Sequence, residues 1–119
     1  MVRGRAPRHK IDQLEGSVES VEANISAGYS KYSGRDRARF FEHALASARE
    51  SRGWYHRSRQ WLGDVESEGR QMLMTQVIKM LTVTIPRERS GGSERRMRRP
   101  RRRDQPNDAA KDKPNDAAQ

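Results

Sequence analysis

Six apolar residues keep to one seven-residue register through residues 34–62, GRDRARFFEHALASARESRGWYHRSRQWL. The residues in this register are Ala38, Phe41, Leu45, Ala48, Tyr55 and Leu62. A row beside it alternates small and aromatic side chains, namely Phe40, Ala44, Ser47, Ser51, Trp54, Ser58 and Trp61. Small residues allow helices to approach closely, and rings fill the gaps between them. The pattern therefore predicts one long, closely packed helix over residues 34–62.

The segment before this helix has the same periodicity. Five apolar residues spaced three and four apart predict another helix with one apolar stripe, formed by Ile11, Leu14, Val18, Val21 and Ile25. Gly28 stands where a left-handed residue would end that helix. Asn24 adjoins the stripe, and its amide is predicted to bond to the loop that follows. Ser33 is predicted to cap the next helix by accepting a hydrogen bond from the amide of Asp36.

The segment after residue 62 predicts a third helix over residues 66–85. Gly63 breaks the preceding pattern and Asp64 is predicted to cap the new helix. Pro86 is predicted to end it, because proline lacks an amide hydrogen and clashes with the preceding turn.

Apolar side chains cover most of this third helix. They are Met72, Leu73, Met74, Val77, Ile78, Met80, Leu81, Val83 and Ile85. Two neighbours in the same chain cover only about half of such a helix. The surplus predicts self-association, with Met74, Ile78 and Ile85 as the intersubunit contacts.

Charge divides the chain into parts. Residues 1–10 have a net charge of +4 and residues 87–103 one of +7, whereas residues 11–86 are neutral. Met97 is the only large apolar residue after Pro86, so nothing there can bury a core. We therefore predict a flexible basic arm at residues 1–10, a helical bundle at 11–86 and a disordered basic tail at 87–119.

The clearest functional feature is an arginine run in this tail. Its members are Arg95, Arg96, Arg98, Arg99, Arg101, Arg102 and Arg103. Closely spaced guanidinium groups bind phosphates and release counterions without a folded site, so the run predicts contact with RNA or another nucleic acid. A tail that only adds solubility is the alternative. No aromatic residue interleaves the arginines, so recognition without sequence preference is expected. Trp54, Tyr55 and Trp61 fit a core or subunit interface better than a base-stacking platform.

Other classes of function find little support. The chain has no cysteine, which excludes disulfides and thiolate metal sites. Asp36, His43 and Glu50 recur every seven residues, but each step spans about 10.5 Å, too far for a shared metal ion. We predict no catalytic residues, cofactor, metal or small-molecule substrate, and hence no enzyme. No apolar segment suits a signal peptide or a membrane span, so a cytoplasmic location without membrane contact is expected.

Residues 20–28, SVEANISAG, resemble the Ser-Ile-Pro-Ala-Asn-Ile-Ala-Glu-Gly signature of the bacterial four-helix-bundle proteins called ribosomal RNA intervening-sequence proteins. Glu22 and Ala27 depart from that signature. Residues 41–55 look like the family's third helix and residues 61–86 like its fourth. The resemblance implies an antiparallel up-and-down bundle and homo-oligomeric, often pentameric, rings. The family's first helix would precede Ile11, so this chain is expected to lack it.

Taken together, the sequence predicts an all-α, antiparallel up-and-down bundle of three helices with a disordered basic tail. The leading functional prediction is a non-enzymatic, homo-oligomeric scaffold whose basic flanks bind nucleic acid non-specifically. The alternatives are a protein–protein interaction module with an unidentified partner and a truncated family member without function.

Overall fold

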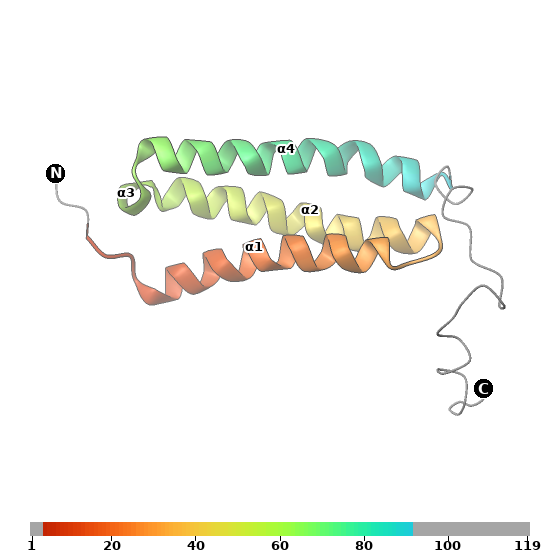
Figure 1. The fold of residues 1–119 in the computed structure, drawn as a ribbon, viewed down its shortest axis with the longest axis horizontal. Helices are drawn as coiled ribbons and strands as arrows, with labels where there is room; N and C mark the ends of the chain where they lie inside the picture. Colours follow the sequence, from red (N-terminus) through yellow and green to blue (C-terminus); the bar gives the residue numbers. More distant parts are fainter. Residues whose placement is uncertain (1–3, 92–119) are drawn as a thin grey trace, which may run out of the picture.

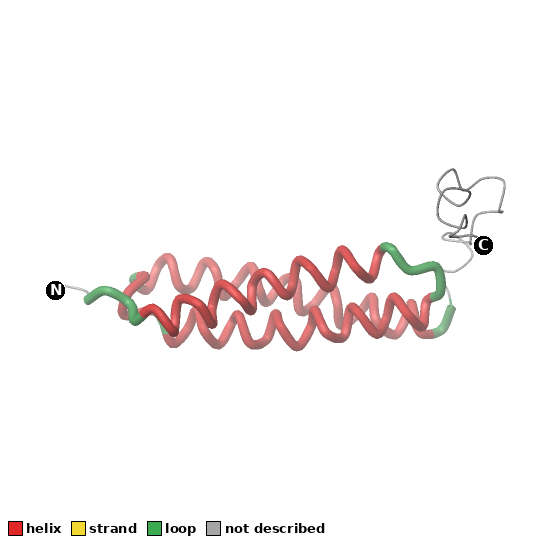
Figure 2. The backbone as a smooth tube through the Cα atoms, turned by 90° about the horizontal axis from the view of Figure 1, so that it is seen from below, coloured by secondary structure: helices red, strands yellow, loops and turns green. Residues whose placement is uncertain are grey.

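The computed structural model describes residues 4–91, which form an all-α bundle of three long helices and one short one. The helices are α1 (Arg8–Tyr29), α2 (Gly34–Arg57), α3 (Arg59–Leu62) and α4 (Asp64–Arg89). Figure 1 shows α2 between α1 and α4 and antiparallel to both, and Figure 2 shows the same rods from below. Residues 4–91 contain no strand, and none of their helices has the length and apolarity to cross a lipid bilayer. The predicted all-α bundle is confirmed.

The core lies where α2 faces its two neighbours. One buried cluster joins α2 to the last turns of α4 and consists of Ala38, Phe41, Ala44, Leu81 and Ile85. A second cluster, Val21, Ala48 and Ile78, takes one residue from each long helix. Ile25, Leu45 and Val77 pack half-buried at the edge of both clusters. Every one of these residues belongs to a row that the sequence periodicity predicts.

Both ends of α1 differ from the prediction. The helix begins at Arg8, so the last three residues of the predicted flexible arm are helical. It also runs through Gly28 to Tyr29, so Gly28 is not the left-handed cap that the sequence suggested. Gly28 is buried against Phe41, and a Cβ at this position would lie 2.5 Å from a carbon of the Phe41 ring. The glycine therefore permits close packing rather than ending the helix.

The predicted single helix over residues 34–62 is interrupted at Ser58, and the separate turn α3 follows. Ser67 of α4 donates from its hydroxyl to the Tyr55 carbonyl at 2.7 Å. A continuous helix would bond that carbonyl to the amide four residues later. Gly63 then ends α3 with a φ of 90° and a ψ of 152°, a conformation that is essentially restricted to glycine. The predicted break at Gly63 is confirmed.

Both predicted ends of the third helix are wrong. Gly63 rather than Asp64 is the N-cap, and it makes no side-chain capping bond. At the other end, α4 continues through Pro86 to Arg89 instead of stopping at residue 85. Loss of the proline amide removes one hydrogen bond within the helix. The turn beyond it is held by Glu88, which is buried and paired with Arg37 of α2. The first three residues of the predicted tail are thus helical, and the rest of that tail, residues 92–119, lies outside the described residues.

Ser33 caps α2 as predicted, since its hydroxyl oxygen accepts a hydrogen bond from the Asp36 amide at 3.1 Å. We expect Ser33→Ala to lower the free energy of unfolding by about 1 kcal/mol, because one amide of the first turn loses its partner. Urea denaturation followed by circular dichroism would measure this loss. Ser30→Ala is the matched control, because its hydroxyl bonds the Ala27 carbonyl at the exposed end of α1. An equal loss in both variants would contradict the capping role.

Candidate functional site

A buried ion pair between Arg37 of α2 and Glu88 of α4 holds together the end of the bundle at which α4 finishes. The Arg37 side chain is 1% exposed, and its Nε donates to Oε1 of Glu88 at 2.7 Å. Its Nη1 donates to the carbonyl oxygens of Lys31 and Tyr32 at 2.9 and 2.7 Å. Gly34 lies beside the pair, and a Cβ there would overlap the backbone carbonyl of Glu88. One guanidinium thus joins α2, the loop after α1 and the last turn of α4.

This pair is not among the features that the sequence pattern predicts. Arg37 lies on a helix with many arginines, and Glu88 falls in a segment that the sequence assigns to the tail. Their side chains meet across 51 positions of the chain. The only local signal is register, because Arg37 precedes Phe41 and Ala44 by one and two turns on the buried side of α2.

The helix α2 carries the basic surface of the described chain. It contains six arginines against three acidic residues. Four of the arginines are exposed, namely Arg35, Arg39, Arg49 and Arg57. At about 100° per residue these four fall on the side of α2 opposite the core. Arg57 lies over the Trp54 ring at 4.4 Å from its centroid, and Arg39 lies over Phe40 at 4.8 Å. These four guanidinium groups therefore share one side of α2, two near its start and two in its second half, with the exposed carboxylates of Glu42 and Glu50 on the same side.

The helix α1 has the opposite charge. It has four acidic residues against Arg8 and Lys10, and all four are exposed: Asp12, Glu15, Glu19 and Glu22. Asp12 forms an exposed ion pair with Arg8 at 3.1 Å. The ion pairs found among residues 4–91 do not involve the other three carboxylates. The neutral middle of the sequence is thus polarised in space, with an acidic helix at one edge and a basic helix beside it.

The remaining ion pairs are exposed. Glu42 of α2 pairs with Arg89 in the last turn of α4. Glu66 pairs with Arg70 one turn later on α4. The hydrogen bond from Arg70 to Glu66, and then that to Tyr55, raises the pKa of Arg70 above its ordinary value. Exposed pairs of this kind contribute at most about 1 kcal/mol each.

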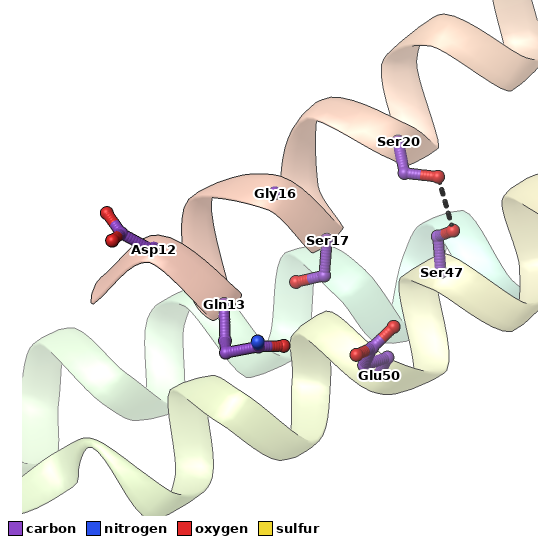
Figure 3. A pocket seen from close by; sticks show the side chains of 7 residues that line it. All are labelled: Asp12, Gln13, Gly16, Ser17, Ser20, Ser47 and Glu50. Carbon is purple, nitrogen blue, oxygen red and sulfur yellow. Dashed lines mark hydrogen bonds between the residues drawn. The ribbon is translucent and has the colours of Figure 1, made fainter. Parts of the chain in front are cut away.

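A shallow polar groove of about 310 Å³ lies between α1 and α2 (Figure 3). It is lined by Asp12, Gln13, Gly16, Ser17, Ser20, Ser47 and Glu50. The hydroxyls are engaged with one another, because Ser20 bonds Ser47 at 2.7 Å and Ser51 donates to Ser17 at 3.0 Å. Figure 3 shows Asp12 pointing away from the space between the helices. The serines are therefore contacts of close helix packing, and the groove brings together no set of catalytic groups.

The three residues predicted as intersubunit contacts pack against the core of their own chain. Ile78 and Ile85 are buried in the two core clusters, and Met74 packs half-buried against the second. Burial in their own chain leaves Ile78 and Ile85 almost no surface for a second copy, and the intersubunit role of the three residues stays a prediction. The large exposed apolar side chains of α4 are instead Val65, Met72, Leu73, Met80 and Val83.

Other predicted site residues are distributed as follows. Arg95, Arg96, Arg98, Arg99, Arg101, Arg102 and Arg103 lie outside the described residues. Tyr55 is buried, and Trp54 and Trp61 are half-buried beside cations, with Lys10 5.2 Å from the Trp61 centroid. Asn24 has an internal partner, but not in the predicted loop, because its Nδ2 donates to the Ser20 carbonyl at 2.8 Å.

These features define a small helical bundle protein with a buried ionic anchor and a polarised surface. The chain matches the family described as 23S rRNA-intervening sequence protein over residues 8–83, which include α1, α2, α3 and most of α4. The protein belongs to this family, and the resemblance read from residues 20–28 is confirmed. It matches no curated protein and no solved structure.

Proposed function

We propose that the protein is a non-enzymatic, self-associating helical scaffold that binds RNA or another nucleic acid without sequence preference. The observation that carries the proposal is the exposed arginine row of α2, formed by Arg35, Arg39, Arg49 and Arg57. This row adds a folded basic surface to the arginine run of residues 95–103.

The chemistry of the row suits a phosphate backbone. Guanidinium groups donate to phosphate oxygens in pairs and stay charged at any physiological pH. The first and last of the four arginines are 22 positions apart, so the row spans about 33 Å at 1.5 Å per residue. Such a row contacts phosphates at intervals along one strand and reads no base.

RNA is the first nucleic acid to test, because the family name refers to an intervening sequence of 23S rRNA. Stacking on bases is not part of the proposal. Trp54 and Phe40 are half-buried, and the arginines already lie over their rings. Recognition by charge without base contacts is therefore expected to be strongly salt-dependent.

The test is the salt dependence of binding to a labelled single-stranded RNA, measured by fluorescence anisotropy with the full chain. Replacing Arg35, Arg39, Arg49 and Arg57 by glutamine should flatten the slope of log K against log salt by about 0.7 per lost contact, so by up to about 3. The matched control replaces Arg8 and Arg70, which are exposed but lie on other helices. Binding that the α2 variant leaves unchanged would contradict a role for this row.

A chain that ends at residue 91 measures the contribution of the arginine run. Truncation at residue 86 is unsuitable, because it removes Glu88 and so leaves Arg37 buried without its carboxylate. If neither the full chain nor the truncated one binds RNA or DNA at moderate salt, the nucleic-acid proposal fails. A protein–protein interaction module is then the better description, favoured by the exposed apolar side chains of α4.

A further inference from the structure

Two tyrosine side chains are exposed where α1 turns into α2. Tyr29, the last residue of α1, is 58% exposed, and Tyr32 in the turn itself is 45% exposed. The tryptophan and phenylalanine rings of residues 4–91, and the Tyr55 ring, are buried or half-buried. Aromatic surface of the described chain is therefore most open to a ligand at this end of the bundle.

Internal contacts hold both tyrosines in place. The Tyr29 ring lies edge-on against the buried Phe41 ring, with 5.2 Å between the centroids. The Arg37 guanidinium donates to the backbone carbonyls of Lys31 and Tyr32 at 2.9 and 2.7 Å, which fixes the turn to α2. A group that is already ordered loses little conformational entropy when a ligand binds to it. The turn therefore offers a preorganised stacking surface for a planar ligand.

Cations accompany these rings. Lys31 Nζ and the Arg39 guanidinium lie 4.9 and 4.8 Å from the centroid of the same Phe40 ring. Arg35 is exposed in the first turn of α2. The ion pairs of the described chain involve none of these three cations. Asp36 is the only acidic residue in the turn and the first two turns of α2, so positive charge prevails there. Neighbouring cations of this kind suit phosphate groups.

The arginine run of residues 95–103 is attached to the same end of the bundle. Figure 1 shows that α4 finishes at the end where α1 turns into α2, and the buried pair of Arg37 with Glu88 joins these parts. Arg95 follows Gly91 by four positions, so the run starts at most about 14 Å from Gly91. A strand bound at the turn is thus within reach of the run, which raises the effective concentration of guanidinium groups around its phosphates.

We propose that the turn between α1 and α2 holds unpaired bases of a single-stranded nucleic acid, which stack on Tyr29 and Tyr32. The adjoining phosphates contact Lys31, Arg35 and Arg39. The inference rests on the nucleic-acid binding in the proposed function and names the form of strand that the turn selects. The arginine row of α2 contacts phosphates only, and the turn adds base contacts at one end of it.

Stacking agrees with binding that has no sequence preference, because every base has a flat face to lay on a ring. The bases of a duplex are already stacked on one another and do not reach the tyrosines, so a duplex contacts only the cations. The tyrosines therefore contribute to binding of a single strand and not to binding of a duplex.

Parallel fluorescence anisotropy titrations of the full chain test the proposal, with a labelled single-stranded RNA and with the duplex that it forms with its complement. Replacing Tyr29 and Tyr32 by leucine should weaken binding of the single strand about tenfold for each stacked base that is lost. Binding of the duplex should change less than about twofold, because the substitutions remove no charge. Tyr29→Phe with Tyr32→Phe keeps both rings and should bind the single strand as the wild-type chain does.

Tyr32→Leu alone leaves the contact between Tyr29 and Phe41 intact and should still cost about tenfold for the single strand. Circular dichroism melts confirm that each variant is folded. A full chain that binds neither RNA at moderate salt overturns both this inference and the nucleic-acid binding proposed above. Salt-dependent binding that the leucine variants leave unchanged, or weaken equally for single strand and duplex, overturns only this inference. An equal loss in the phenylalanine variant would assign the effect to the hydroxyl groups and overturn stacking.

Discussion

Replacing Glu88 by alanine is expected to lower the free energy of unfolding by about 3–5 kcal/mol, the largest effect of any side-chain truncation in the last turn of α4. The substitution leaves the Arg37 guanidinium buried without a counter-charge, and an uncompensated buried charge is costly. It also releases the turn after Pro86, whose backbone already lacks one hydrogen bond. Chemical denaturation of the full chain, followed by circular dichroism, measures the change.

Two further variants make the result interpretable. Arg37→Met combined with Glu88→Leu removes both charges and should recover part of the loss, because an apolar pair has no desolvation cost, while the carbonyls of Lys31 and Tyr32 lose their donor. Glu42→Ala breaks the exposed pair with Arg89 and should cost no more than about 1 kcal/mol. If Glu88→Ala were as mild as Glu42→Ala, the pair would not be the anchor that its burial indicates. Should Glu88→Ala fail to fold, recovery in the double variant still decides the question.

The second large effect is expected from Gly34→Ala. A methyl group at this position would overlap the backbone carbonyl of Glu88, and backbone cannot rotate out of the way as a side chain can. The last turn of α4 must therefore move away from α2, which disturbs the geometry of the Arg37 pair. We expect a loss of about 3 kcal/mol, at the upper end for overpacking, measured by the same denaturation experiment.

Gly16→Ala and Gly69→Ala are the matched controls. Both glycines are exposed within helices and an added Cβ meets nothing within 4 Å. Alanine is the better helix former, so each control should gain about 0.5–1 kcal/mol. A loss of stability for Gly34→Ala with a gain for the two controls would show that steric contact, rather than helix propensity, determines the effect at Gly34. A gain at all three positions would contradict the close approach of α2 and α4.

The sequence predicts the features of this fold that depend on local periodicity or local hydrogen bonds. The apolar rows of all three long helices, the Ser33 cap and the break at Gly63 are of this kind, because the interacting atoms lie within one or two turns. The same local reasoning fails at Gly28, Pro86 and Ser58. Gly28 is required by the close approach of the Phe41 ring, which belongs to another helix. Pro86 is tolerated inside α4 because the ion pair between Arg37 and Glu88 holds the turn beyond it.

The exposed surfaces, too, are predictable only as far as they depend on local sequence. Exposed apolar surface on α4 is predictable from its composition, but which residues form it depends on the direction in which α2 approaches. That direction buries Ile78 and Ile85 and leaves Met72 and Val83 exposed. The net charge of residues 11–86 does not reveal the basic row of α2, because it sums to zero. The compensating acidic residues lie on another helix.

An odd number of long antiparallel helices has a consequence for how the ends of the chain can act. The described residues begin at one end of the bundle and finish at the other, as Figure 1 shows. The 26 residues of α4 separate those ends by about 39 Å. A single polyanion that touches both ends of residues 4–91 must therefore extend along the bundle for this whole length. If the protein binds nucleic acid as proposed, only a ligand of at least this length can contact both ends of residues 4–91 at once, and we expect avidity only for such ligands.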